Sequence, residues 1–335
     1  MTDFFVTYGI FLAKSLTTVL AILAIFGGIM ATVSKGKLRA KEKLEVIDLN
    51  EHYQEIKTLM YGEILDKKSL KLFLKKERKN QKTNAEEKNV GRKNSGGNIF
   101  AIDFTGDIKA SAVENLREAI TAVLTIATIN DEILINLESP GGTIHCYGLA
   151  ASQLQRIKER RIPLTVAVDR VAASGGYMMA CVADKILAAP FAIIGSIGVI
   201  AQLPNFHRFL KKHDVDYEQI MAGEYKRTLS LFGENTDEGR EKMQQDVNEA
   251  HQLFQNFISA HRATVNIERL ATGETWYGIK AQEIGLVDEI STSDDYLLKA
   301  SENRRIFKVV HSIKKSLGEK LSLSLEQSLA RIFNL

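Results

Sequence analysis

The sequence predicts an α/β domain with a largely parallel, buried sheet, placed after an N-terminal membrane anchor and a basic linker. Three observations support this prediction. From residue 98 onward, short apolar strands alternate with amphipathic helices, which is the pattern of βαβ units. Residues 16–33 form an apolar run without a charge. Between these two regions, residues 35–93 hold 17 Lys and Arg against 10 Asp and Glu.

Composition places the chain among ordinary globular proteins. Of its 335 residues, 45% are hydrophobic and 25% charged, which excludes wholesale disorder and a purely fibrous design. The two cysteines, Cys146 and Cys181, form no metal-ligand spacing, so we expect neither a disulfide framework nor a metal site. The net charge of +3 is concentrated in the basic linker rather than on one face of a domain. We therefore expect no nucleic-acid partner.

The apolar run at residues 16–33 is long enough to cross a bilayer. A signal peptide places positive charge at its N-terminus, whereas here Met1-Thr2-Asp3 has none and a dense basic cluster at residues 35–43 follows the run. We therefore expect residues 1–34 to be an uncleaved, single-pass anchor in a lipid membrane. A cleaved signal peptide and a buried core helix are the alternatives. The positive-inside rule, taken alone, puts the bulk of the chain in the cytoplasm.

Residues 35–97 are expected to connect the anchor to the α/β domain. Apolar residues recur at helical spacing over residues 44–66, which predicts a helix close to the membrane. The stretch 67–97 is rich in Lys and Asn and ends in Gly96-Gly97. Such a stretch is either a solvated linker or a contact for anionic lipid head groups.

The α/β domain is expected over residues 98–300. The apolar runs predict strands at 99–104, 132–137, 163–168 and 185–188, with a further strand around 217–221. Helical spacing predicts helices at 111–127, 147–160, 175–184 and 237–262, the last capped near Thr236. Residues 301–335 form a basic amphipathic segment, expected to serve in packing or subunit contact.

Two glycine-bearing turns follow predicted strands, where open α/β sheets place their sites. They are Glu138-Ser139-Pro140-Gly141-Gly142 and Ala172-Ala173-Ser174-Gly175-Gly176-Tyr177. A glycine pair lets backbone N–H groups point into a cavity, as an oxyanion or phosphate site requires. Neither turn fits a nucleotide-binding pattern. Ser174 stands at the mouth of a helix, where it is either a nucleophile or an N-cap.

A nucleophilic serine needs a base. The histidine candidates, none in a recognisable triad context, are His145, His207, His213, His251 and His261. Lys226, just after the strand expected around 217–221, is the alternative base. A lysine serves as a base only when its amine is neutral, which apolar walls or a nearby cation such as Arg227 favour. From position alone, the choice between surface lysine and catalytic lysine stays open.

Five motifs occur in the order found in signal peptide peptidase A and its relatives, and the chain resembles this family of serine-lysine peptidases. The motifs are Ser-Pro-Gly-Gly (139–142), Ala-Ala-Ser-Gly-Gly-Tyr (172–177), Gly-Ser-Ile-Gly-Val-Ile (195–200), Tyr-Lys (225–226) and Gly-Leu-Val-Asp (285–288). The likeness covers almost the whole chain and is greatest to the membrane-anchored branch. It implies a ClpP/crotonase-like domain with repeated ββα units, no cofactor, and a place in the cell inner membrane.

The resemblance also implies roles for individual residues. Ser174 would be the nucleophile, Lys226 its general base, and Ser196 would hydrogen-bond the lysine. The oxyanion hole would consist of backbone N–H groups, contributed by Gly175, Gly141 and Gly142. Because the chain has one catalytic domain rather than a tandem repeat, we expect a homo-oligomer.

The leading hypothesis is a membrane-anchored serine endopeptidase that cleaves unfolded or membrane-derived peptides, such as remnant signal peptides. A non-proteolytic membrane scaffold with the same fold is the alternative from another class, and an acyl-CoA enzyme of the crotonase type is a third. The Ser-Lys pair favours the first. Better-known relatives have an extracytoplasmic catalytic domain, whereas the basic flank of the anchor favours a cytoplasmic one. The membrane side of the site therefore stays open.

Overall fold

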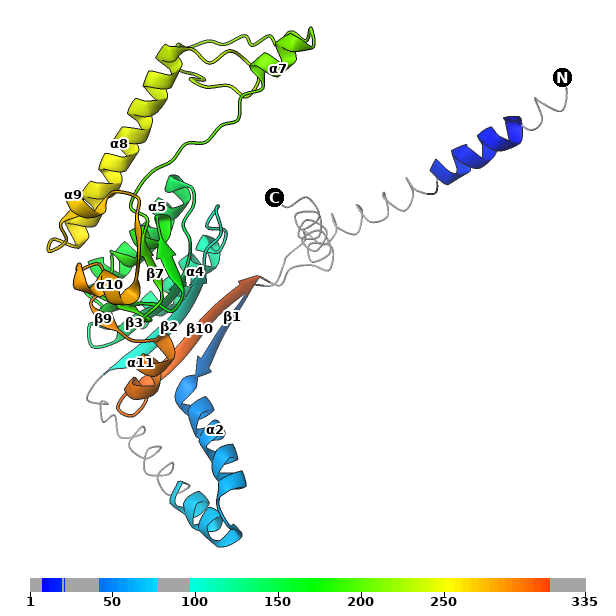
Figure 1. The fold of residues 1–335 in the computed structure, drawn as a ribbon. Coiled ribbons are helices and arrows are strands. Elements are labelled where there is room, and N and C mark those ends of the chain that lie inside the picture. The colour runs from blue at the N-terminus through cyan, green and yellow to red at the C-terminus, as the bar shows by residue number, and fades with distance from the viewer. Residues whose placement is uncertain (1–7, 20, 22–41, 78–96, 314–335) are drawn as a thin grey trace. The chain divides into compact units, whose positions relative to one another are not determined.

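A computed structural model describes residues 8–19, 21, 42–77 and 97–313 of the chain (Figure 1). The chain divides into two compact units, of which one is Val46–Val310 and the other comprises Met1–Glu45 with His311–Leu335. Residues 8–19 and 21 are helical, whereas most of the predicted anchor at 1–34 lies outside the described residues. No helix of the described ranges is both long and apolar enough to span a bilayer.

Two sheets form in the described part of the chain. The larger has the strand order β1-β10-β2-β3-β4-β6-β9, and the smaller has the order β5-β7-β8. The strands are β1 (Glu42–Asp48), β2 (Asn98–Thr105), β3 (Glu132–Glu138), β4 (Leu164–Val168), β5 (Val171–Ala173), β6 (Lys185–Ala188), β7 (Ile193–Gly195), β8 (Thr275–Tyr277), β9 (Glu289–Ile290) and β10 (Arg305–Ile313). The predicted parallel α/β sheet is confirmed: β10, β2, β3, β4, β6 and β9 pair in parallel.

The chain visits the two sheets alternately. After β4 it enters the smaller sheet as β5, and after β6 it enters the same sheet as β7. Strands β5 and β7 pair in parallel, with Ala173 opposite Gly195. Because of this path, the ends of β5 and β7 lie next to each other. The motifs that contain Ser174 and Ser196 begin at these strand ends.

The labelled helices of the described residues are α2 (Leu49–Ile64), α4 (Val113–Leu124), α5 (Ile144–Glu159), α6 (Gly175–Ala180), α7 (His207–Lys212), α8 (Asp237–His261), α9 (Ile267–Leu270), α10 (Gly278–Glu283) and α11 (Ser293–Ala300). Some of them pack on the two faces of the larger sheet. On β2, Phe100 and Ile102 join the main core together with residues of α4, α5 and α6, whereas Ile99 and Ala101 pack with Leu297 of α11. This alternation follows from the two-residue period of a strand that is buried on both faces.

Three predicted elements differ in the structure. The helix expected over 44–66 begins only at Leu49, because Glu42–Asp48 is strand β1 and the Asp48 carboxylate caps the helix. Residues 305–313 of the expected amphipathic tail are strand β10, parallel to β2. The strand expected around 217–221 is irregular backbone.

Helix α8 is capped as predicted, since the Thr236 side chain accepts a hydrogen bond from the Gly239 amide. Only its C-terminal half is anchored in the core, because its buried residues are Phe254 and Ile258. Residues 199–235, which we call the arm, connect the smaller sheet to the N-terminal end of α8 and contain α7 (Figure 1). The arm is mostly exposed, with Ile220 98% and Ile200 75% accessible.

Candidate active site

Ser174 lies between β5 and α6 in a backbone conformation that favours glycine, with φ +52° and ψ −118°. An L-residue with a Cβ is strained there. Although it occupies the N-cap position of α6, its side chain makes no capping hydrogen bond. Ser174 is half-buried, and its hydroxyl does not accept the hydrogen bond that an N-cap residue accepts. The N-cap interpretation of Ser174 is therefore not supported.

The Ser-Pro-Gly-Gly turn lies directly against the Ser174 backbone. A Cβ on Gly141 would come within 2.7 Å of the Ser174 Cβ and 2.8 Å of the Gly175 nitrogen. Gly141 also has φ +91°, so both its conformation and its surroundings require glycine. The two glycine-bearing turns predicted from the sequence therefore meet at one place, beside the hydroxyl-bearing residue.

Of the three backbone N–H groups predicted to form the oxyanion hole, one has a hydrogen-bond acceptor among the described residues and two do not. The Gly141 amide donates to the Ser139 Oγ over 3.1 Å. Within the described residues, the amides of Gly142 and Gly175 have no hydrogen-bond acceptor. Gly175 is the first residue of α6, whose free N–H groups favour negative charge. The geometry therefore leaves the Gly142 and Gly175 amides available to an oxyanion.

Ser196 follows β7 in the same way that Ser174 follows β5. The Ser174 amide donates to the Gly195 carbonyl oxygen over 2.8 Å, so the two serines occupy neighbouring strand ends. Ser196 also has φ +52°, and its amide donates to the Glu274 carbonyl oxygen over 2.6 Å. The structure thus places Ser174 and Ser196 at neighbouring strand ends.

Lys226 lies apart from these residues. It is exposed on a turn of the arm, where its amide donates to the Gly223 carbonyl oxygen. The preceding residue, Tyr225, lies under the Lys242 ammonium of α8, 5.7 Å from Nζ to the ring centroid. Lys242 and Phe254, the first buried residue of α8, are about 18 Å apart along the helix axis. In this single chain the arm therefore holds Lys226 away from Ser174.

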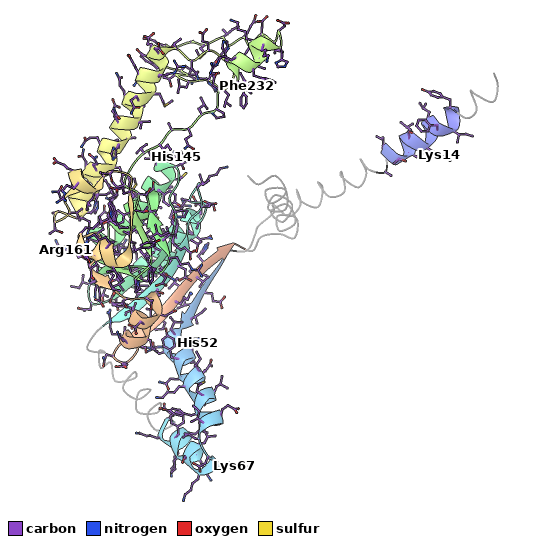
Figure 2. All side chains as sticks on the ribbon, viewed as in Figure 1. Lys14, His52, Lys67, His145, Arg161 and Phe232 are labelled. Carbon is purple, nitrogen blue, oxygen red and sulfur yellow. The ribbon has the colours of Figure 1, made fainter. Side chains whose placement is uncertain are left out.

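None of the five candidate histidines hydrogen-bonds Ser174 in the described structure. His145 is exposed at the start of α5 (Figure 2). His207 and His213 belong to the arm, and the Nδ1 atoms of His213 and His261 lie 2.8 Å from backbone oxygens of their own helices. His251 lies on α8, with its Nε2 3.3 Å from the Gln255 amide nitrogen. The described residues thus offer no histidine base to Ser174.

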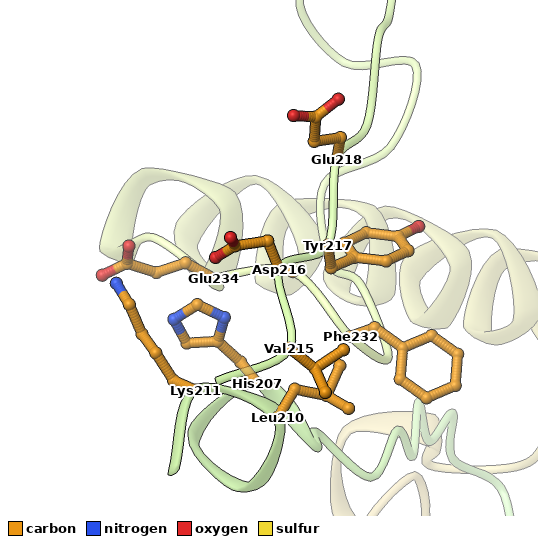
Figure 3. Close-up of a pocket in the computed structure, with 10 residues that line it drawn as sticks. His207, Leu210, Lys211, Val215, Asp216, Tyr217, Glu218, Phe232 and Glu234 are labelled. Atoms are coloured by element: carbon orange, nitrogen blue, oxygen red, sulfur yellow. The ribbon is translucent and has the colours of Figure 1, made fainter. Parts of the chain in front are cut away.

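The arm contains a pocket of about 380 Å³, separate from the candidate site (Figure 3). Polar groups of Lys211, Asp216 and Glu234 surround it, and apolar groups of Leu210 and Phe232 form its floor. His207, one of the five histidine candidates, lines this pocket, whereas Ser174, Ser196 and Lys226 do not. In the described ranges, no three His, Cys, Asp or Glu side chains gather to hold a metal ion.

Sequence reasoning missed one buried pair beneath the glycine turn. The Ser139 Oγ and the Tyr147 Oη lie 2.5 Å apart, and both side chains are fully buried. The sequence predicts Tyr147 only as the start of a helix. The available signal is a serine directly after a buried strand with a tyrosine one helical segment later, which is too common a pattern to identify a contact by itself.

Two models of one protein family match almost the whole chain. The chain matches Peptidase family S49 N-terminal over residues 3–154 and Peptidase family S49 over residues 156–306. It is 47% identical to a probable protease SohB of Haemophilus influenzae, covering 100% of this chain and 96% of that protein. A putative protease SohB of Buchnera aphidicola subsp. Baizongia pistaciae is 43% identical, with 93% of both chains covered.

Solved structures with a related arrangement have low sequence identity. A mutant membrane-bound stomatin-specific protease in complex with a substrate peptide is 17% identical, covers 72% of this chain and 100% of that chain, and has a TM-score of 0.42. The ClpP catalytic domain of Plasmodium falciparum is 13% identical, covers 58% of this chain and 85% of that chain, and has a TM-score of 0.38.

Proposed function

The chain belongs to peptidase family S49 and is a serine protease of the SohB type, and on this premise we propose that it is an endopeptidase with a Ser174-Lys226 dyad. One observation carries the proposal. Ser174 is held in a strained conformation at the start of α6, without a capping bond, beside two amides that lack acceptors among the described residues. Strain retained at a hydroxyl-bearing residue is typical of catalytic centres.

In the proposed reaction, Ser174 attacks the carbonyl carbon of the scissile peptide bond. Lys226 takes the serine proton, delivers it to the leaving amine, and then activates the water that hydrolyses the acyl-enzyme. The Gly142 and Gly175 amides stabilise the oxyanion, and each such donor is worth about 10²–10³-fold in kcat. Ser196 orients the lysine from the neighbouring strand end.

The exposed position of Lys226 means that the arm must be brought to a Ser174 before the dyad can form. We propose that self-assembly does this, because the arm exposes apolar side chains such as Ile200, Phe209 and Ile220 that water solvates poorly. Assembly would also enclose the sites in a shared cavity that admits extended chains. A strictly monomeric species with full peptidase activity, established by light scattering, would contradict this part of the proposal.

The proposed substrates are unfolded or membrane-derived peptides, including remnant signal peptides. This follows from the proposed anchor at residues 1–34, which would hold the protein in the cell inner membrane, where such peptides accumulate. The basic flank at residues 35–43 is the observation that supports membrane attachment after the anchor. Resistance of the full chain to alkaline carbonate extraction is the expected result, and release into the soluble fraction would oppose it.

Labelling with a fluorophosphonate probe tests the proposed chemistry. We expect the wild-type chain to be labelled at Ser174 and to cleave unfolded peptides. Ser174→Ala and Lys226→Ala should each lower peptide hydrolysis by roughly 10³-fold or more, because the two groups act as a unit. His145→Ala is the control and should keep appreciable activity. Near wild-type turnover in either dyad variant would show that the dyad assignment is wrong. A wild-type chain that is neither labelled nor able to cleave peptides would favour the non-proteolytic scaffold.

A further inference from the structure

A chain of three hydrogen bonds lies beneath the Ser-Pro-Gly-Gly turn. The Gly141 amide donates to the Ser139 Oγ (3.1 Å), the Ser139 Oγ lies 2.5 Å from the Tyr147 Oη, and the Tyr147 hydroxyl donates to the Asp107 carbonyl oxygen (2.7 Å). The ends determine its direction, since an amide only donates and a carbonyl only accepts. Ser139 therefore donates its proton to Tyr147.

Neighbouring backbone packs closely against these groups. A Cβ on Gly106 would lie 2.4 Å from the Tyr147 Oη and 2.6 Å from the Ser139 Oγ. A Cβ on Gly175 would lie 2.3 Å from the Tyr147 Cγ, so the tyrosine ring rests on the Gly175 backbone. Tyr147 thus touches one proposed oxyanion donor with its ring. The Tyr147 hydroxyl also holds Gly141, through Ser139. Gly141 directly precedes Gly142, the other proposed donor.

We propose that Ser139 and Tyr147 are positioning residues for the oxyanion hole, an inference that rests on the proposed peptidase function. By binding the Gly141 amide from below, Ser139 sets the rotation of the peptide that follows. The Gly142 amide is then directed toward the position beside the Gly175 amide. A misplacement of about 1 Å in such a donor can cost about 10²-fold in rate.

The burial of Ser139 and Tyr147 favours one fixed hydrogen-bonding arrangement for their hydroxyls. Both side chains are 0% exposed, so neither hydroxyl can exchange its partner for water without opening the turn. Burial raises the pKa of Tyr147, which keeps its hydroxyl protonated and able to donate. Removal of either hydroxyl therefore frees the Gly141 amide or leaves a buried donor unpaired, and the turn gains freedom at the site.

Two conservative variants of the full chain test the proposal. Tyr147→Phe keeps the ring against Gly175 and removes only the hydroxyl, whereas Ser139→Ala removes the acceptor of the Gly141 amide. We expect each to lower kcat by about 10–100-fold and to leave KM within about twofold. Affinity for a peptide aldehyde, which forms a tetrahedral oxyanion on the serine, should fall in parallel with kcat. The double variant should be no worse than Ser139→Ala.

Tyr177→Phe is the matched control. Tyr177 is also 0% exposed, and its hydroxyl donates to the Leu286 carbonyl oxygen over 3.1 Å. This hydroxyl has no hydrogen bond to the Ser-Pro-Gly-Gly turn among the described residues. Its loss should lower the thermal unfolding midpoint as much as Tyr147→Phe does while leaving kcat within about twofold. Unchanged kcat in a folded Tyr147→Phe or Ser139→Ala variant would overturn the proposal, as would an equal loss of kcat in Tyr177→Phe.

Amide hydrogen exchange at Gly141 separates this inference from the proposed function. We expect exchange to be at least about tenfold faster in Ser139→Ala and Tyr147→Phe than in the wild type and in Tyr177→Phe. This result would support the hydrogen-bonded chain even if the wild-type protein cleaved no peptide, in which case the peptidase proposal alone would fail. Unchanged exchange at Gly141 would overturn the positioning role whether or not the protein is active.

Discussion

Ser174 and Ser196 follow paired residues of two parallel strands, and both have φ +52°. The Ser174 amide donates to the carbonyl oxygen of Gly195, the residue before Ser196. A positive φ is therefore imposed twice, at adjacent strand ends, on residues that both have hydroxyl side chains. The smaller sheet holds these two hydroxyl-bearing residues in register before any substrate binds.

The strain at Ser174 predicts a difference between two inactive variants. Ser174→Gly and Ser174→Ala both lose the hydroxyl, but only alanine keeps a Cβ at φ +52° and ψ −118°. We expect the glycine variant to be more stable than the alanine variant by about 1 kcal/mol, after allowing for the extra unfolded-state entropy of glycine. Thermal unfolding checks this, and an alanine variant of equal or higher midpoint would contradict it.

Gly175 and Gly148 offer a matched pair of glycine-to-alanine substitutions. Gly175→Ala would place a Cβ 2.3 Å from the Tyr147 Cγ, so we expect destabilisation by about 1–3 kcal/mol and loss of peptidase activity. Gly148 lies inside α5, where an added Cβ would meet nothing within 4 Å, and Gly148→Ala should stabilise by about 0.5–1 kcal/mol. Chemical denaturation measures both, and a harmless Gly175→Ala would refute the contact.

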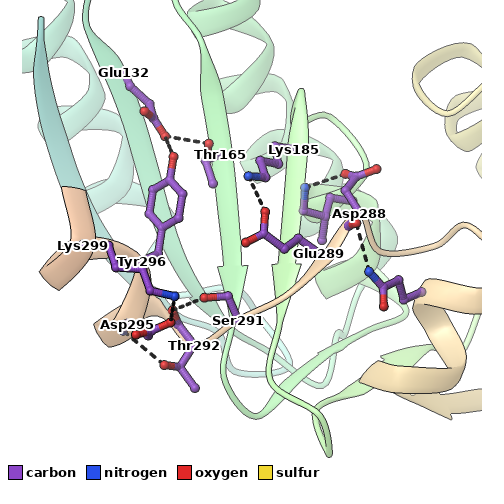
Figure 4. Close-up of polar contacts among 12 residues, drawn as sticks. Glu132, Thr165, Lys185, Asp288, Glu289, Ser291, Thr292, Asp295, Tyr296 and Lys299 are labelled. Carbon is purple, nitrogen blue, oxygen red and sulfur yellow. Dashed lines mark hydrogen bonds and ion pairs between the residues drawn. The ribbon is translucent and has the colours of Figure 1, made fainter. Parts of the chain in front are cut away.

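The Gly-Leu-Val-Asp motif has a structural explanation that predicts unequal effects at neighbouring acids. Asp288 binds Arg262 through both carboxylate oxygens (2.8 and 2.9 Å) and accepts from the Ile186 amide (2.7 Å), with the Arg262 side chain 9% exposed. Glu289 pairs with Lys185 near the surface (Figure 4). Asp288→Asn should cost about 2 kcal/mol and Glu289→Gln under about 1 kcal/mol. Equal losses of unfolding free energy would contradict this ranking.

Asp131 predicts a pH-dependent contribution to stability. Burial raises the pKa of its carboxyl, but hydrogen bonds from the Asn98 amide and the Thr128 amide and hydroxyl outweigh burial and hold the pKa below its usual value. A lowered pKa in the folded state stabilises the protein above the unfolded-state value, and this stabilisation is lost as pH falls below it. Asp131→Asn should therefore destabilise at pH ~7 by about 1–3 kcal/mol.

The difference between Asp131→Asn and the wild type should shrink as the pH falls below about 4, because the wild-type carboxyl then becomes protonated as well. Thermal unfolding midpoints across this range measure the effect. Asp216→Asn, at an exposed position of the arm, is the control and should show a small difference at every pH. A difference for Asp131→Asn that stays constant from neutral to acid pH would contradict the assignment.

The strands that the sequence predicted well are buried apolar runs of four or more residues. The predictions at 132–137 and 185–188 agree with β3 and β6 within a residue, because a strand buried on both faces is a continuous apolar run. Strands of three residues, such as β5 and β7, escaped detection because such short segments have no measurable period. The tail strand β10 was predicted only as part of a basic amphipathic segment, because its partner, β2, lies about 200 residues earlier in the chain.

The sequence by itself determined the family and the α/β class, and it named Ser174, Ser196, Lys226 and the two glycine turns as candidates, because these depend on residue types in a linear order. Only the tertiary structure decided which of them meet. The pairing of β5 with β7 sets the backbone of both serines, and buried Ser139 and Tyr147 occupy the Gly141 amide. The arm keeps Lys226 exposed. Distances between segments far apart in sequence arise from strand pairing and close packing, which no local pattern encodes.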